Sequence, residues 1–587
     1  MKNRLIKSGA IILAAGMSFI TTSMAGIDNN VVVSATSTNT PISFIAGNTL
    51  TSVKDSVMAD FDELVRVIED THPDPYMSFG GRVFFHKRAN DIRRELMNDS
   101  NVNVTALYRK ASEFISQMQD GHSFLNSPQN VNNASGSDSL LVVKFMCDDG
   151  ALIVNAIDSI RGDLIGSRLI GINGVPIEGV LDRVAVSHPC ENRYGRLSVL
   201  CNWFRPVSFY RTILANSFSD SYSGLNTSIR SVTDTARQSD FIMDFLTSDG
   251  DTIRYVPEKV QYNQFGEIAK ARAPRDERFP SEQMEWKEVD GTMFFRLASV
   301  IARENFEFQY NNRWDFYDQL AYQYRTMGKD MPSDTLAAIK ALPSMSETFL
   351  EMLQEMKAKD LKNLVIDLRG NGGGWTPIVL PTLYMMFGDR YLDTDMDAKF
   401  YRRISDLYLN KVTTDIATFN ANNGTQLKVG DYLMPEETAT DTRTMEEKRQ
   451  DFLHSAFCSD SIRKLLLERN GKPIYTPEKI YVVTDDGTFS AAFHYAFYLS
   501  KLGAVIAGET SSQAPNCYME VTPFTLPLTG LSGSISNTMQ VFLPANDPRS
   551  KEFTPDITLT YDDYRNYGFD GNSILIHLLE SLNISAD

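Results

Sequence analysis

The sequence predicts a multidomain α+β protein in which a helical region, a β-rich region and an α/β region follow one another. Two helical faces of apolar residues lie near the N-terminus, over 53–68 and 104–118. Short β segments then fill 140–260, and after Glu285 strands alternate with helices, which is typical of a sheet covered by helices. The chain has 587 residues, enough for several such units at about 150 residues per domain.

These changes of pattern place the domain boundaries. A helical N-terminal domain is expected over 49–135, a β-rich domain over 136–278 and an α/β domain over 279–587. Two polar stretches, about 301–343 and 391–474, interrupt the alternation of the last domain. We expect both of them to be insertions on the surface of its core.

Turn and capping residues mark the ends of the predicted elements. Ser344 and Glu347 have the spacing of a capping box at the start of a helix over 346–357. Gly121 suits the left-handed residue that ends the helix over 104–118. A hairpin is expected at Asp249-Gly250-Asp251. Continuous apolar runs predict buried strands in the α/β domain, at 364–368, 480–483 and 504–507.

The first 25 residues have the layout of a secretory signal peptide. Three basic residues precede an apolar stretch over 10–20, and small-residue cleavage sites end at Ala25 and at Ala35. The apolar stretch is shorter than the roughly 20 residues that span a bilayer. We therefore expect an exported protein, extracellular or periplasmic, with a flexible leader over 26–48 and no stable membrane anchor.

Charge and cysteine content exclude several classes of function. The chain has 57 Lys and Arg against 74 Asp and Glu, a formal net charge of −17, and it lacks a basic stripe that would follow a phosphate backbone. Nucleic acid is therefore not an expected partner. Its five cysteines are never spaced as CxxC, so neither a zinc ribbon nor a thioredoxin motif is present. We expect free cysteines, and neither a metal nor a cofactor.

A serine at a strand-to-helix junction is the first candidate for chemistry. Ser490 follows Gly487-Thr488-Phe489 after the strand over 480–483, where a helix N-terminus favours developing negative charge. The Ala491 N–H is placed to donate to an oxyanion. The alternative is that Ser490 only caps the helix, which is the more common role of a serine at this position.

A glycine-rich turn follows the strand over 364–368. Its sequence from Asp367 to Pro377 is DLRGNGGGWTP, with Thr376 as the expected N-cap of a helix. The N–H groups of such a turn can point at an anion or an oxyanion. The lysine of a phosphate-binding loop does not follow these glycines. A tight turn without a ligand is the alternative.

A serine nucleophile needs a base, and the chain has seven histidines. His122 stands out because it follows a helix end and has Asp120 and Ser123 as polar neighbours that could orient its ring. His494 is four residues after Ser490 on one helix face, so its side chain runs beside the serine rather than facing it. For each histidine, a buried structural imidazole is the alternative.

Taken together, these segments resemble the C-terminal-processing (tail-specific) serine protease family. The matching segments are DGHS at 120–123, IDLRGNGGG at 366–374 and DDGTFSAA at 485–492, in this order. No lysine lies about 25 residues after Ser490, where Ala514 stands, so the branch that pairs serine with lysine is disfavoured. The tricorn-core-like branch, which uses Ser, His and Glu, is favoured.

The resemblance implies a fold, a reaction and a set of site residues. It implies a PDZ-like fold for 136–278 and a crotonase/ClpP-like ββα spiral for 279–587. The implied reaction is hydrolysis of peptide bonds in an unfolded or extended polypeptide through an acyl-enzyme. The implied site consists of Ser490 as nucleophile, His122 as base, Glu552 or, in competition with it, Glu509 as the group that orients the base, and the Ala491 and Gly373 N–H groups as oxyanion hole.

Two other functions remain open at this point. One is a non-catalytic protein that binds a hydrophobic ligand or a peptide on the same fold. The other is a serine esterase that acts on small substrates. Convergence of His122, Ser490 and a carboxylate in space would favour an enzyme over the binding protein.

Overall fold

The computed structural model describes residues 52–128, 139–201, 204–215, 241–261, 270–434 and 443–584. The predicted signal peptide and leader lie outside the described residues, so both remain predictions. Among the helices that are described, none is long and apolar enough to cross a membrane.

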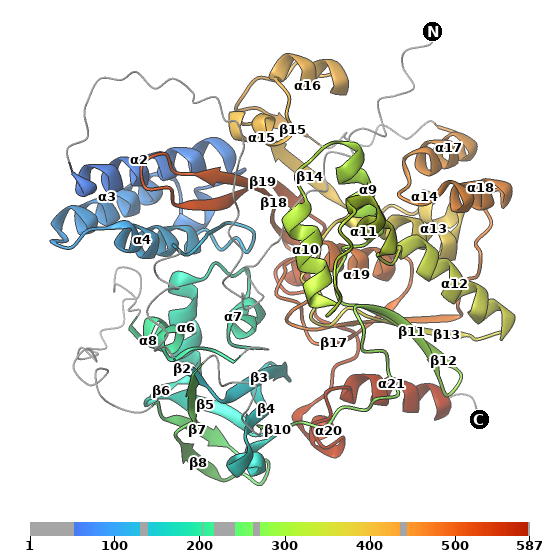
Figure 1. Ribbon diagram of the computed structural model, residues 1–587, viewed down its shortest axis with the longest axis horizontal. Helices are drawn as coiled ribbons and strands as arrows, with labels where there is room; N and C mark the ends of the chain where they lie inside the picture. Colours follow the sequence, from blue (N-terminus) through green and yellow to red (C-terminus); the bar gives the residue numbers. More distant parts are fainter. Residues whose placement is uncertain are drawn as a thin grey trace.

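Three α-helices form the N-terminal part of the chain as far as the structure describes it, from residue 52 on (Figure 1). α2 (Val53–Thr71) and α4 (Val104–Ser116) lie where the apolar periodicity predicts helices. α3 (Arg82–Asn98) has no counterpart among the predicted helices. Its buried positions, such as Phe85 and Ile92, stand among charged residues, which weakens the apolar pattern.

The N-terminal helices share their core with a hairpin from near the C-terminus. The tip of the hairpin formed by β18 (Asn516–Thr525) and β19 (Ser532–Val541) packs against α2, as Figure 1 shows. Its apolar side chains join the buried cluster of α2–α4, through Phe524, Leu526, Leu531 and Ile535. Two parts of the chain that are far apart in sequence therefore bury each other's apolar surface.

An antiparallel sheet forms the β-rich part. β7 (Met243–Leu246) and β8 (Thr252–Tyr255) pair across Asp249-Gly250-Asp251, which confirms the predicted hairpin. The strand order is β10-β4-β5-β7-β8, with β3 beside β4 and β6 beside β5. The remaining elements of this part are β3 (Val143–Asp148), β4 (Ala151–Asp158), β5 (Arg168–Ile172), β6 (Val175–Pro176), β10 (Lys270–Arg272), α6 (Ile177–Ser187), α7 (Arg193–Leu200) and α8 (Val207–Ala215). A separate pair joins β2 (Ser139–Leu141) to β9 (Lys259–Gln261).

A five-stranded sheet with helices on both faces forms the α/β part. Its order is β11 (Met284–Val289), β12 (Thr292–Leu297), β13 (Asn363–Asp367), β16 (Lys479–Thr484) and β17 (Val505–Gly508), and β12 to β17 run parallel. Leu364 and Ile366 face one buried cluster, whereas Val365 between them faces another, as expected for a strand covered on both sides. The covering helices are α12 (Met345–Ala358), α13 (Leu380–Phe387) and α19 (Ala491–Lys501) on one face and α20 (Tyr561–Asn566) and α21 (Ser573–Ile584) on the other.

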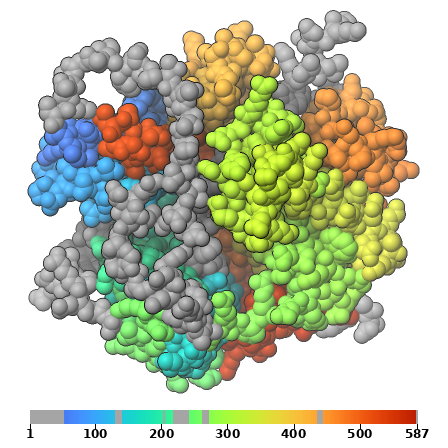
Figure 2. Space-filling view, in the orientation of Figure 1, coloured from blue at the N-terminus to red at the C-terminus, as the bar shows by residue number. Residues whose placement is uncertain are grey.

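The two polar stretches lie at the surface of the face shown in Figure 2, and both add helices to the α/β part. The first contains α9 (Arg303–Asn311), α10 (Tyr317–Thr326) and α11 (Thr335–Ala341). The second contributes β14 (Lys399–Arg403), which pairs with β19 and so extends a second sheet with β1 (Phe124–Leu125) and β15 (Tyr432–Leu433). Its helices are α14 (Asp389–Asp393), α15 (Asp406–Lys411), α16 (Ile416–Asn423), α17 (Met445–Ser455) and α18 (Asp460–Glu468).

Three predicted helix ends differ from the structure. Gly121 does not end α4, because the residue in the left-handed region is Gln119, with a φ of 54°. Thr376 is not an N-cap, because it lies within a 3₁₀ turn that Trp375 precedes. Ser344 does cap α12, but Glu347 bonds to Arg303 instead of completing the capping box.

Candidate active site

Ser490 sits in a strained turn between β16 and α19. Its backbone has φ 54° and ψ −122°, a conformation that a residue other than glycine rarely adopts and that is often found at functional sites. Its N–H donates a hydrogen bond to Oε1 of Gln513. The Ser490 hydroxyl makes no capping bond to α19, so the alternative of a simple N-cap is not what the structure shows. A strained strand-to-helix turn is the device by which α/β hydrolases present a nucleophilic serine.

The glycine-rich turn after β13 packs directly against Ser490. A Cβ atom added to Gly373 would lie 2.7 Å from the Ser490 Cβ and 2.9 Å from the Ala491 nitrogen, so only glycine fits there. The Phe489 N–H donates to the Asn371 carbonyl at 2.9 Å and joins the two turns. The Gly373 N–H itself donates to Asn371 Oδ1 at 2.9 Å. An oxyanion would therefore have to draw this hydrogen away from Asn371, whereas no described acceptor holds the Ala491 N–H.

His122 lies beside the residue that precedes the nucleophile. Its ring stacks on Phe489 with 4.5 Å between ring centroids and an interplanar angle of 28°. His122 is 1% exposed and Ser490 3% exposed, and neither ring nitrogen of His122 has a hydrogen-bond partner among the described residues. Gly121 makes this approach feasible, because a Cβ there would meet Phe489 Cζ at 2.9 Å and Glu191 Oε1 at 3.2 Å.

Asp120 and Ser123 hold the backbone around His122. The Asp120 carboxylate accepts hydrogen bonds from the His122 N–H at 2.9 Å and from the Ser123 hydroxyl. Ser123 Oγ in turn accepts the Ser536 N–H of β19 at 3.0 Å. Burial raises the pKa of the Asp120 carboxyl, but its contacts with His72 and His122 bring it below its ordinary value on balance. The carboxylate therefore stays ionised inside the protein.

Glu191, from the segment between α6 and α7, is the carboxylate that reaches His122. Its Oε1 lies 3.7 Å from His122 Nδ1, and its Oε2 accepts the Ala514 N–H at 2.7 Å. Burial raises its pKa, and the contact with His122 works against that rise. The sequence has no signal for this residue, because nothing in its neighbourhood points to chemistry and only the fold brings it to His122.

Part of the chain matches a known protein family. Residues 335–559 match the model of peptidase family S41. This segment has the sequence of a family S41 serine peptidase. The match covers Ser490 and the glycine-rich turn, whereas His122 and Glu191 lie outside it.

Solved structures resemble the peptidase over most of its length. Mature CPAF complexed with lactacystin gives a TM-score of 0.51 at 14% identity, covering 90% of this chain and 99% of the other. The photosystem II D1 C-terminal processing protease gives 0.37 at 12% identity, covering 86% and 94%. The CPAF match, with a TM-score above 0.5 but 14% identity, shows a shared fold alone. No curated protein matches the sequence.

The two glutamates that the resemblance implied as orienting groups lie elsewhere in the peptidase. Glu509 accepts the Asp149 N–H at 2.8 Å and the Tyr564 hydroxyl at 3.4 Å, so it joins β17 to the turn between β3 and β4. Burial raises the pKa of Glu509 to about 7. Glu552 is partly exposed, and the described residues show no contact between its carboxylate and His122. Among the described residues, Glu191 is thus the glutamate whose carboxylate contacts His122.

His494 is a structural histidine of the peptidase. Its Nε2 lies 2.6 Å from Gln540 Oε1 and its Nδ1 lies 2.9 Å from the Thr376 hydroxyl. Burial lowers its pKa to about 4, so the ring is neutral at ordinary pH. With both nitrogens engaged, His494 cannot accept a proton from Ser490, which agrees with the sequence argument.

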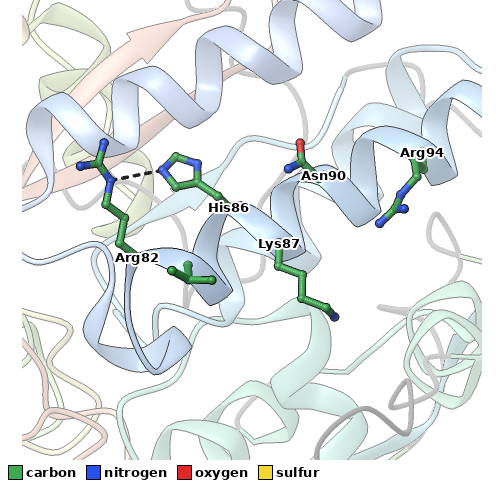
Figure 3. Close-up of a pocket in the computed structure, with 6 residues that line it drawn as sticks. Arg82, His86, Lys87, Asn90 and Arg94 are labelled. Atoms are coloured by element: carbon green, nitrogen blue, oxygen red, sulfur yellow. Dashed lines mark hydrogen bonds between the residues drawn. The ribbon is translucent and has the colours of Figure 1, made fainter.

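A basic groove of about 530 Å³ lies on the outer face of α3 and is separate from these residues (Figure 3). Its lining includes Arg82, His86, Lys87 and Arg94. Lys87 and Arg94 both pair with Asp91, and the Arg82 Nε lies 3.5 Å from His86 Nε2. The groove shares no residue with the Ser490 centre, and neighbouring acidic side chains offset much of its charge.

Proposed function

We propose that the protein is a secreted endopeptidase that cleaves extended polypeptides through a Ser490 acyl-enzyme, with His122 as general base. The observation that carries this proposal is the strained Ser490 turn, against which the glycine-rich turn and His122 both pack. The DGHS segment, the glycine-rich turn and the serine turn are remote in sequence. Their meeting in one buried place is what a serine hydrolase requires.

The proposed reaction follows from the positions of these groups. His122 takes the proton of the Ser490 hydroxyl as the oxygen attacks the substrate carbonyl, and the Ala491 N–H and the Gly373 N–H bind the oxyanion. The tetrahedral intermediate collapses as His122 returns the proton to the leaving amine. Water, deprotonated by His122, then attacks the acyl-enzyme, and His122 returns this proton to the Ser490 oxygen as the acyl group leaves. The Ser490–His122 bond would form on substrate binding, since such bonds are often loose in a free enzyme.

The same proposal includes the finer assignments of fold and location. The antiparallel sheet with α6 against it supports a PDZ-like fold for the β-rich part, and the parallel sheet with helices on both faces supports a crotonase/ClpP-like core. The signal-like sequence of residues 1–25 supports export. Nucleic acid is not among the proposed partners, in keeping with the net charge of −17.

Replacement of the nucleophile tests the proposal. Ser490→Ala is expected to abolish both cleavage of a denatured protein substrate and labelling by a serine-directed phosphonate, while the thermal unfolding temperature stays close to that of the wild type. Ser500→Ala, in the same helix and with its hydroxyl bonded only to the Phe497 carbonyl among the described contacts, is the matched control. Full cleavage by Ser490→Ala would refute the proposal.

The two other functions give different results in the same assays. A binding protein would not react with the phosphonate, and an esterase would react but leave a library of peptides intact. The stacking of His122 on Phe489, next to Ser490, and its contact with the buried Glu191 carboxylate favour an enzyme over a binding protein, since burying a charge beside a hydrophobic ligand is costly.

A further inference from the structure

The β-rich part contributes directly to the surroundings of the proposed base. Its segment between α6 and α7 crosses to the loop that follows β17. There the Ala514 N–H donates to Glu191 Oε2 at 2.7 Å, and the Asn192 side-chain amide donates to the Ser511 carbonyl at 3.1 Å. The same amide lies 3.3 Å from the Lys551 carbonyl. Three hydrogen bonds thus hold this segment on the α/β part.

The loop that receives Glu191 also holds the nucleophile. Gln513, next to Ala514, is completely buried, and its Oε1 accepts the Ser490 N–H. The Ser511 hydroxyl donates to the Gln513 carbonyl at 2.9 Å, which stiffens the loop. One short loop therefore contacts the backbone of Ser490 on one side and the carboxylate of Glu191 on the other.

The charge of Glu191 has little compensation apart from His122. Its side chain is 3% exposed, and His122 is its ion-pair partner among the described residues. Asp120, which also contacts the His122 segment, carries the same sign of charge and so opposes ionisation of Glu191. A buried carboxylate without a cation is costly. The cost falls when His122 takes up a proton, which is the charge state that forms during proton transfer from a serine.

We propose that Glu191 is the positioning residue of His122, and that the site is complete only when the segment 188–192 of the β-rich part is docked on the loop 511–514. This inference rests on the proposed function. Glu191 orients the imidazole through Nδ1 and stabilises the imidazolium, while the docking bonds fix Glu191 itself. The β-rich part thereby acts as a component of the active site in addition to any part it has in binding substrate.

Glu191→Gln tests the proposal with little change of shape. The amide oxygen can still accept the Ala514 N–H, but the charge beside His122 is lost. We expect kcat to fall on the order of 10²–10⁴-fold with KM changed less than about threefold, because removal of the charge from a serine-protease triad costs about 10⁴. The acid limb of the pH–rate profile should move to lower pH, because the carboxylate no longer favours the imidazolium. The unfolding temperature should stay within a few degrees.

A second variant separates docking from charge. Asn192→Ser keeps an acceptor for the Gly195 N–H at the start of α7 but loses the two bonds to Ser511 and Lys551. We expect a fall in kcat of about tenfold with an unchanged acid limb. Glu178→Gln, an exposed glutamate of α6 that pairs with Arg193, is the control and should match the wild type.

The outcomes separate this inference from the proposed function. An unchanged kcat and pH profile in Glu191→Gln, or a larger loss in Glu552→Gln than in Glu191→Gln, would overturn the role of Glu191 while leaving Ser490 as the nucleophile. A wild-type protein that neither cleaves nor reacts with the phosphonate would instead refute the proposed function. Loss of kcat in Glu191→Gln with a shifted acid limb supports the inference.

Discussion

Ser490 holds a backbone conformation that costs about 1–3 kcal/mol in residues other than glycine. Three contacts keep it there: the Gln513 amide on its N–H, the Gly373 turn against its Cβ, and the start of α19 behind it. Strain of this kind survives only where the surroundings determine the conformation. We expect this strain to lower stability while it fixes the orientation of the Ser490 hydroxyl.

The strain predicts that glycine at position 490 makes the protein more stable than alanine does, although neither variant is active. Ser490→Gly should raise the free energy of unfolding relative to Ser490→Ala by about 1 kcal/mol, because glycine adopts a positive φ without steric cost. Both variants should lack activity. Denaturant unfolding of the two proteins measures the difference. Equal stabilities would show that the turn is unstrained.

At the scale of elements, carboxylates are buried where the turn between β3 and β4 meets the end of β17. Glu509 binds the Asp149 N–H there, next to Asp148, Asp486 and Tyr564. Burial raises the pKa values of Asp148 and Asp486 above their ordinary range, as it raises that of Glu509 to about 7. These groups hold protons in the folded protein at pH values where the unfolded chain has released them.

The raised pKa of the buried Glu509 carboxyl predicts that the protein becomes less stable as the pH rises from about 4.5 to about 7. The unfolded chain ionises Glu509 near pH 4.5, whereas the folded protein keeps the proton until about pH 7. Unfolding therefore releases a proton in this window, and Glu509 alone should lower the free energy of unfolding by up to about 1.4 kcal/mol per pH unit. Denaturant titrations between pH 4.5 and 8 measure the slope.

Glu509→Gln is the matched variant for this test. Its amide oxygen can still accept the Asp149 N–H, and it has no proton to lose. The dependence of the free energy of unfolding on pH should therefore report about one proton fewer released on unfolding between pH 4.5 and 7. Glu178→Gln, whose glutamate is exposed, should keep the slope of the wild type. An identical slope in Glu509→Gln and the wild type would contradict the assigned direction of the shift.

At the scale of the whole molecule, the hairpin of β18 and β19 connects the N-terminal helices to the site. Its tip completes the core of α2–α4, and the body of β19 pairs with β1, just after His122 in the chain. The Ser123 hydroxyl is bonded to the Ser536 N–H of the same strand. A substitution that disrupts the helical core should therefore change the position of His122, the proposed base.

Two leucines of the hairpin tip test whether the hairpin and the N-terminal helices share one core. Leu526 is 1% exposed in the helical core, and Leu528, two residues further on, is 45% exposed. Leu526→Ala should lower the free energy of unfolding by about 2–4 kcal/mol, because it leaves a cavity. Leu528→Ala should change it by less than about 0.5 kcal/mol. Equal effects in thermal unfolding would contradict the shared core.

Local pattern was sufficient for much of the α/β part. The strands β13, β16 and β17 and the helices α12 and α19 agree with continuous apolar runs and a capping serine, since these signals lie within a few residues of each other. The sequence did not predict α3, because charged residues interrupt its apolar face. The prediction of Thr376 as an N-cap was wrong, because its hydroxyl bonds to His494 rather than to a helix end.

The sequence by itself determined the serine turn, the glycine-rich turn and the resemblance to a peptidase family, because each rests on short motifs whose chemistry is carried by adjacent residues. Tertiary structure decided which carboxylate meets His122. Glu552 and Glu509 stood in plausible segments, yet packing engages Glu509 with the β3–β4 turn and brings Glu191 to the ring. A pairwise contact between distant segments leaves no trace in either segment, because it depends on how buried surfaces fit together.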